Sequence, residues 1–216
     1  MKIKHYITSI CLSLLIVTLF AFKQQKPLQI VCFGDSITYG AKVDGHSWVS
    51  FLKEDHPEVD FVNAGRSGRR TADKKELLPV LEKYPSADKY LIFLGVNDLK
   101  DGNDSMVNNN VENMKWMIAE IRKVNPKAQI VLLAPTDINL KTMDSVNVKK
   151  KYNQNTKTSL RHLRKSYHKL AKDQELGFIS LLHAVSKPNY ADGLHPDLAG
   201  QKEIAEVVWK GLKTMN

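Results

Sequence analysis

Three side chains in this sequence have the types that nucleophilic catalysis requires. Ser36 stands in the stretch Gly34-Asp35-Ser36, where a run of apolar and small residues ends. A serine hydroxyl is a weak nucleophile until a neighbouring base accepts its proton, and the imidazole of His195 is a base of that kind. Asp192, three residues before the histidine, can hold the imidazole in the tautomer that this proton transfer needs. Gly-Asp-Ser is also ordinary turn chemistry, so the fold has to decide between the two interpretations.

Short apolar runs alternate with longer amphipathic segments, and this alternation predicts the elements that position these side chains. The apolar runs are typical of buried strands and cover residues 28–33, 60–62, 90–94, 129–134 and 177–181. Helical patterns cover residues 47–55, 72–84, 107–124, 146–174 and 198–212. Strands that alternate with helices in this way predict an α/β fold, a three-layer α/β/α sandwich around a mostly parallel five-stranded sheet.

Polar stretches follow the ends of several predicted strands. The ligand crevice of such a sheet lies outside the carboxyl ends of its strands, and Ser36 comes just after the first strand. The stretch "NAGRSGRRT" (63–71) follows the second strand, "GVND" (95–98) follows the third, and "DGLHP" (192–196) precedes the last helix. Three strand ends and one late loop therefore offer polar groups to a single crevice.

These stretches, taken together with "GDSITYG" (34–40), resemble the four sequence blocks of the SGNH hydrolases, also called the GDSL esterase/lipase family. The resemblance covers residues from about 28 to the C-terminus, and we expect a single hydrolase domain over 28–216 with the flavodoxin-like fold of that family. It implies that Ser36 is the nucleophile and that Asp192 and His195 complete a catalytic triad. It also implies an oxyanion hole formed by the Ser36 N–H, the Gly68 N–H and the Asn97 side-chain amide, and it implies no cofactor.

Several residues beside these blocks have less specific patterns. Arg66, Arg69 and Arg70 flank Gly68, and we predict them as candidate contacts to an anionic or hydroxyl-rich substrate. The alternative is that they belong to a solvated loop or pair with acidic neighbours. Asp35 and Asp98 are predicted to stabilise their loops, with a direct catalytic role as the alternative. Solvated or packing roles are predicted for His56, His162, His168 and His183. His46, at the start of the first predicted helix, is predicted to be a cap or a pocket-wall residue.

The function that this pattern favours is an ester hydrolase that works through an acyl-enzyme on small acyl esters. The chain is compact and has no long apolar lid segment between Leu99 and Val107, which favours acetyl groups on carbohydrates, or short-chain and aryl esters. A lysophospholipase or an acyl thioesterase of the same family is the alternative. From another class, a non-catalytic glycan-binding surface protein is also considered, because a fold alone does not establish chemistry.

The N-terminal segment 1–22 has the layout of an export signal. Lys2, Lys4 and His5 precede an apolar run over residues 7–22, and polar residues follow it. We therefore expect an exported protein, periplasmic or secreted, with an uncleaved membrane anchor as the alternative. Removal of the segment would leave Cys32 as the remaining cysteine, so the core would have to be stable without a disulfide.

Composition sets the broad class. A chain of 216 residues with 43% apolar and 25% charged residues is typical of one globular domain. The formal net charge of +9 is spread over lysine-rich helical segments, and the densest run, 149–151, has no interleaved aromatic residues. This distribution excludes an obvious nucleic-acid-binding tract. No set of His, Cys, Asp and Glu in the sequence has the spacing of metal ligands, so no metal is predicted.

Overall fold

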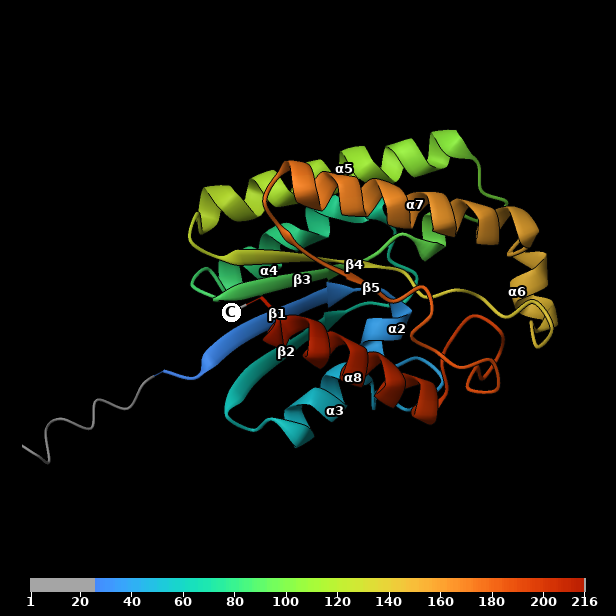
Figure 1. Cartoon of the computed structure of the whole chain (residues 1–216), viewed down its shortest axis with the longest axis horizontal. Coiled ribbons are helices and arrows are strands. Elements are labelled where there is room, and N and C mark those ends of the chain that lie inside the picture. The colour runs from blue at the N-terminus through green and yellow to red at the C-terminus, as the bar shows by residue number, and fades with distance from the viewer. Residues whose placement is uncertain (1–25, 216) are drawn as a thin grey trace, which may run out of the picture.

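The computed structural model describes residues 26–215, so the predicted signal or anchor at 1–22 lies outside the described residues. Its centre is one sheet of five strands in the order β2-β1-β3-β4-β5, and every pairing is parallel (Figure 1). The strands are β1 (Leu28–Gly34), β2 (Val59–Gly65), β3 (Lys89–Phe93), β4 (Gln129–Ala134) and β5 (Gly177–Ser180). The predicted α/β sandwich around a parallel five-stranded sheet is confirmed.

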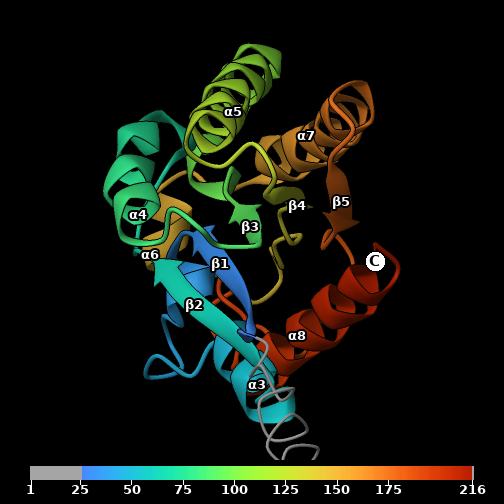
Figure 2. The same ribbon diagram turned by 90° about the vertical axis from the view of Figure 1, so that its left-hand side faces the viewer.

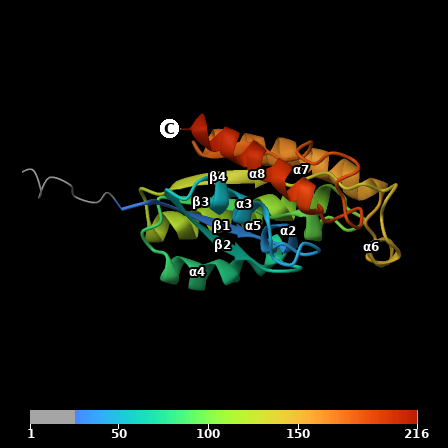
Figure 3. The same cartoon turned by 90° about the horizontal axis from the view of Figure 1, so that it is seen from below.

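Helices cover both faces of the sheet (Figure 2). Successive residues of a strand point to opposite faces, so in β1 Val31 and Phe33 pack into one core while Ile30 and Cys32 pack into the other. The first core is covered by α4 (Leu77–Lys83), α5 (Asp104–Val124) and α7 (Gln154–Asp173). The second is covered by α3 (Trp48–Asp55) and α8 (Leu198–Lys213); Figure 3 views the molecule from this side. Burial on both faces explains the apolar runs in the three inner strands, β1, β3 and β4, whereas the edge strand β2 also has exposed polar residues.

The long helices begin where a side chain accepts a hydrogen bond from the first turn. Ser47 does so for α3, Asn103 for α5 and Asp197 for α8. Such caps satisfy backbone N–H groups that have no partner within the helix. None of the helices between residues 26 and 215 combines the length and apolar character needed to cross a bilayer.

The prediction of one helix over 146–174 was wrong. The structure has two helices there, α6 (Ser145–Lys149) and α7, separated by a short turn. Lys151 in this turn has a left-handed backbone conformation with φ 67°, and the side chain of Asn153 accepts hydrogen bonds from the first amides of α7. Local capping therefore divides this segment into two helices, although the apolar spacing alone predicts one.

The prediction of one helix over 72–84 was also too simple. The segment divides into a 3-10 helix, η1 (Thr71–Glu76), and α4, which is shorter than the predicted helix. Within η1 the backbone of Asp73 lies outside the helical region. A further four-residue helix, α2 (Ser36–Tyr39), follows β1 and was not predicted.

Two glycines allow α2 to lie directly on the ends of β1 and β2. Gly34 and Gly65 are paired neighbours in the sheet. A Cβ atom on Gly65 would lie 2.3 Å from the backbone nitrogen of Tyr39, and one on Gly34 would lie 2.1 Å from the Thr38 hydroxyl oxygen. Because both distances are shorter than van der Waals contact, this close approach requires glycine. This close approach holds α2, the short helix that begins with Ser36, against the ends of both strands.

We expect Gly65→Ala to destabilise the protein by about 2–3 kcal/mol, because the added methyl group overpacks a contact with backbone atoms that cannot move aside. The free energy of unfolding in urea measures this change. Ser67→Ala, an exposed position in the same loop, is the control and should stay within about 0.5 kcal/mol of the parent protein. Equal stability of both variants would contradict this account of the β1, β2 and α2 contact.

Candidate active site

Ser36, His195 and Asp192 form one continuous line of hydrogen-bonded side chains. The Ser36 Oγ lies 3.0 Å from His195 Nε2, and His195 Nδ1 lies 2.8 Å from Asp192 Oδ2. When Nδ1 carries the proton and donates it to the carboxylate, Nε2 is free to accept the proton of the serine hydroxyl. The structure therefore brings together three side chains that the sequence places up to 159 positions apart.

The loop that carries Asp192 and His195 is held tightly. Asp192 Oδ1 accepts hydrogen bonds from the backbone N–H groups of Leu194, at 3.1 Å, and His195, at 2.7 Å. Tyr190 and Pro196 form an isolated antiparallel bridge that closes the loop. Burial works to raise the pKa of the Asp192 carboxyl, but the hydrogen bonds and charge of His195 outweigh it and hold that pKa well below its usual range. The carboxylate therefore stays ionised beside the imidazole.

Asn97 lies in the short 3-10 helix η2 (Val96–Asp98), directly after β3. Its Nδ2 donates to the backbone oxygen of Arg69 at 3.1 Å and lies 3.4 Å from Asp35 Oδ2. Its Oδ1 accepts a hydrogen bond from the Tyr152 hydroxyl at 2.8 Å. The amide is therefore held at both ends, with its nitrogen on the side of Asp35 and the Gly68–Arg69 loop.

Gly68 adopts a left-handed backbone conformation with φ 76°, and a Cβ atom there would have no heavy atom within 4 Å. Glycine suits this position because of its backbone angle, and the space above it is open to a ligand. Within residues 26–215 the Gly68 N–H donates to no protein acceptor. Ser36 is the first residue of α2, where helix amides lack an intrahelical acceptor. Both amides are thus available to a bound group.

Tyr152 is a part of the site that the sequence analysis missed. It is buried in the turn between α6 and α7, at a position that was predicted to lie inside a continuous helix. Burial, followed by the negative charges of three aspartates, raises the pKa of its hydroxyl well above the usual range: Asp35, Asp98 and Asp192. The hydroxyl therefore stays protonated and donates to Asn97. No motif marks this residue in the sequence.

The arginines flanking Gly68 have different surroundings. Arg69 is buried, and its Nη1 donates to the backbone oxygens of Gly34, at 2.5 Å, and Ala64, at 2.6 Å. Arg66 pairs with Glu76 through its Nε at 2.6 Å. These two guanidinium groups are engaged by the protein itself, whereas Arg70 is 55% exposed and lines a cavity. Of the three candidate substrate contacts, Arg70 is therefore the one whose side chain faces open space.

The two aspartates beside the motifs hold backbone in place. Asp35 Oδ1 accepts a hydrogen bond from the Ile37 N–H at 2.9 Å and so caps α2. Complete burial raises the pKa of Asp35 to about 6, against the opposing effect of that bond. Both carboxylate oxygens of Asp98 accept hydrogen bonds from Thr71, which joins η2 to η1.

The other described histidines lie away from Ser36. His56 stacks on Trp209, with ring centroids 3.6 Å apart, and His46 contacts Phe51 edge-on. His162 and His168 lie on α7, and His183 lies in the turn after β5. Within residues 26–215 no group of three His, Cys, Asp or Glu side chains is arranged to hold a metal ion.

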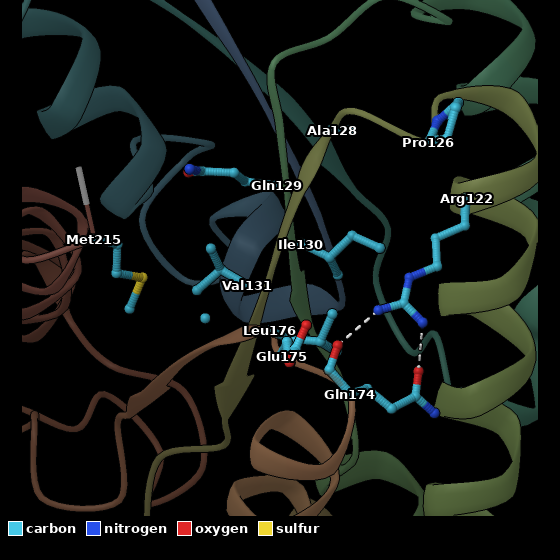
Figure 4. A pocket seen from close by; sticks show the side chains of 11 residues that line it. Arg122, Pro126, Ala128, Gln129, Ile130, Val131, Gln174, Glu175, Leu176 and Met215 are labelled. Atoms are coloured by element: carbon cyan, nitrogen blue, oxygen red, sulfur yellow. Dashed lines mark hydrogen bonds between the residues drawn. The ribbon is translucent and has the colours of Figure 1, made fainter.

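Two cavities lie near opposite ends of the sheet. One, of about 450 Å³, adjoins Asn97 between η1, η2 and the first turns of α5. The other, of about 440 Å³, lies at the amino ends of β4 and β5, where Arg122 donates to Gln174 (Figure 4). The lining of the second cavity contains no serine, cysteine or histidine. Ligand sites of such sheets lie at the carboxyl ends of the strands. The cavity beside Asn97 lies at such an end, and Asn97 is the one proposed site residue in its lining.

The arrangement is suited to attack on a carbonyl carbon. A serine with a base in contact can form a covalent acyl intermediate, and the negative charge on the carbonyl oxygen needs nearby donors. The N–H groups of Ser36 and Gly68 are available at this edge of the sheet. The Asn97 amide lies at the same edge, with its nitrogen donating to the Arg69 backbone oxygen. Loss of one such donor typically costs about 3–4 kcal/mol of transition-state stabilisation.

Comparison with known proteins gives consistent results. The sequence model of the GDSL-like Lipase/Acylhydrolase family matches residues 32–203. An arylesterase of Vibrio mimicus is 27% identical over 207 residues, which cover 91% of this chain and 94% of that protein. The crystal structure of a lipase/acylhydrolase from Enterococcus faecalis has a TM-score of 0.67 at 26% identity, covering 87% of this chain and 96% of that one. A carbohydrate acetylesterase family member from Sinorhizobium meliloti has a TM-score of 0.73 at 18% identity, covering 87% and 98%, and shows the shared fold.

We expect a fluorophosphonate probe to label Ser36 in the parent protein, because an activated serine attacks the phosphorus atom. His195→Ala should slow labelling by a factor on the order of a thousand, since the base is lost. Asp192→Asn should retain more reactivity than His195→Ala, because the base remains. Intact-mass spectrometry over time measures the rate. His183→Ala is the matched control and should label like the parent; an unreactive His183→Ala beside a reactive His195→Ala would show that the base is the other histidine.

Tyr152→Phe should slow labelling of Ser36 by about five- to tenfold, because the loss of one hydrogen bond, worth about 1 kcal/mol, frees the Asn97 amide to rotate. Tyr90→Phe removes a comparable buried hydrogen bond, from the Tyr90 hydroxyl to the Tyr84 backbone oxygen. That control should lose stability and keep the labelling rate. Equal labelling rates in Tyr152→Phe and Tyr90→Phe would refute a positioning role for Tyr152.

Proposed function

The chain belongs to the GDSL-like lipase/acylhydrolase family of carboxylic ester hydrolases, and from this premise we propose that it cleaves small acyl esters through an acyl-enzyme on Ser36. The observation that carries the proposal is the 3.0 Å contact between Ser36 Oγ and His195 Nε2, with Asp192 at 2.8 Å from the other ring nitrogen. A protein that only binds a glycan would not need this activated serine, which argues against the non-catalytic alternative.

The proposed reaction has two halves. In the first, Ser36 Oγ attacks the ester carbonyl carbon while His195 Nε2 accepts the hydroxyl proton. The resulting oxyanion lies among the N–H groups of Ser36 and Gly68 and the amide of Asn97. His195 then gives the proton to the departing alcohol, which leaves an acyl group on the serine. In the second half, His195 accepts a proton from a water molecule as that water attacks the acyl carbon. His195 then returns the proton to Ser36 Oγ, and the acid is released.

The lining of the cavity beside Asn97 supports short acyl groups. Its apolar side chains are Ala72 and Met106, and the rest of the lining is polar or charged. A long acyl chain would need a continuous apolar groove to remove its methylene groups from water. The related Vibrio mimicus protein is an arylesterase, and the neighbour from Sinorhizobium meliloti belongs to the carbohydrate acetylesterases. We therefore propose acetyl and other short-chain esters of carbohydrate or aryl alcohols as substrates.

We also propose that residues 1–22 direct export and that residues 28–216 form the hydrolase domain. The basic residues before the apolar run and the polar residues after it support the first part. The span of the family match, 32–203, supports the second.

Hydrolysis of a series of nitrophenyl esters tests the acyl specificity. We expect kcat/KM to be highest from acetyl to butanoyl and to fall about tenfold or more by dodecanoyl, because the polar cavity gives no apolar cover to a long chain. His195→Ala measured in parallel subtracts hydrolysis that does not depend on the site. Acetylated xylan and lysophospholipid complete the comparison. A rate that rises steadily with chain length, or turnover of lysophospholipid alone, would overturn the short-chain proposal.

A further inference from the structure

Two cationic and two acidic side chains line the cavity beside Asn97. Arg70 from the loop before η1 and Lys100 from the loop after η2 both line it. Asn97, whose amide is one of the donors to the proposed oxyanion, also lines the cavity. A group bound there would therefore lie beside one residue of the proposed oxyanion hole.

The acidic residues that line the same cavity already have partners. Both oxygens of Asp98 accept hydrogen bonds from Thr71, at distances from 2.8 to 3.1 Å. Glu112 on α5 accepts a hydrogen bond from Lys115 at 2.7 Å. Glu112 is thus paired with Lys115, whereas Asp98 keeps its negative charge, which acts on both Arg70 and Lys100.

The two cations are much less engaged. Among residues 26–215 Lys100 has no ion pair, and its ammonium lies 5.6 Å from the centre of the Tyr152 ring. Arg70 reaches only Asp73, at 3.7 Å, with a side chain that is 55% exposed. Partial burial, followed by the positive charges of Lys150 and Arg70, lowers the pKa of Lys100. Like charges that converge on one cavity repel each other until an anion binds between them.

We propose that Arg70 and Lys100 form a subsite for an anionic group, a carboxylate or a phosphate, carried by the ester substrate. This inference rests on the proposed function and narrows its substrate class to esters that bear a negative charge close to the scissile bond. Arg70 offers a planar fork of N–H donors that matches either anion, and Lys100 adds a point charge from the opposite loop. Asn109, which also lines the cavity, has no other hydrogen bond within the described residues and provides a neutral donor.

Pairs of matched esters with and without the charge test the subsite. On the alcohol side, 4-acetoxybenzoate is compared with its neutral methyl ester, and 4-acetoxyphenyl phosphate with phenyl acetate. On the acyl side, mono-4-nitrophenyl succinate is compared with 4-nitrophenyl butanoate. For each pair the ratio of kcat/KM, charged over neutral, is measured in the parent protein, Lys100→Met, Arg70→Gln and Lys123→Met. Because intrinsic reactivity within a pair is the same for every variant, changes in the ratio report recognition alone.

In at least one pair, we expect Lys100→Met and Arg70→Gln each to lower the ratio about fivefold, the effect of one charge-assisted contact near solvent. The pair that responds identifies the anion and the side of the ester that carries it. Lys123→Met removes an equal charge from the far end of α5, where Lys123 pairs with Glu120, and should keep the parent ratio. Added salt should reduce the preference of the parent protein and leave that of Lys100→Met nearly unchanged.

The outcomes are distinct. If neutral esters are cleaved and no ratio differs among the four proteins, the anionic subsite is wrong and the proposed function stands. If Lys123→Met lowers the ratio as much as Lys100→Met, the effect is general surface charge and the subsite is wrong as well. If the folded parent protein cleaves no ester of either kind, the proposed function itself fails. Circular dichroism melting of each variant verifies that it is folded.

Discussion

The buried guanidinium of Arg69 is the interaction on which the geometry of the active site depends. It lies 4.1 Å from the centre of the Phe33 ring, and its donors reach the last carbonyl groups of β1 and β2 and the carboxylate of Glu76. Backbone oxygens at strand ends need hydrogen-bond donors, and this buried cation donates to two of them. The Gly34 oxygen also accepts from the Arg66 N–H at 3.1 Å. The backbone oxygen of the same residue accepts from Asn97. The side chain and the backbone oxygen of this one residue thus tie together the loops that follow β1, β2 and β3.

The site also shows how the surroundings divide the roles of similar residues. Asp35 and Asp192 are both buried carboxylates close to His195, yet their pKa values shift in opposite directions. Asp192 receives hydrogen bonds from both the ring and the backbone of the histidine and remains charged. Asp35 receives one strong backbone hydrogen bond, and burial dominates, raising its pKa to about 6. The first is suited to stabilising an imidazolium, while the second is suited to holding a helix start.

Much of this arrangement could be predicted from the sequence, and the reasons for the rest are physical. The inner strands, buried on both faces, have nearly continuous apolar sequences. The parallel order brings the ends of the strands to one edge of the sheet, where Ser36 and Asn97 both lie. Tyr152 could not be found, because the apolar spacing predicts one continuous helix there, whereas α6 ends at Lys149 and the side chain of Asn153 caps the start of α7. Nor does any local signal in "RSGRR" separate Arg69, which enters the core, from Arg70, which stays outside it. That difference depends on carbonyl groups contributed by distant strands.

The separation of Ser36 and His195 along the chain has a consequence for the synthesis of the protein. During synthesis the nucleophile emerges early and its base emerges 159 residues later, after every strand of the sheet. The loop that carries the base is anchored from two directions, since Asp144 and Asn147 beside α6 both donate to the Asp192 backbone oxygen. A nascent chain therefore carries an ordinary, unreactive serine until almost all of its length has been made. The reactivity proposed for Ser36 therefore arises only once the fold is complete.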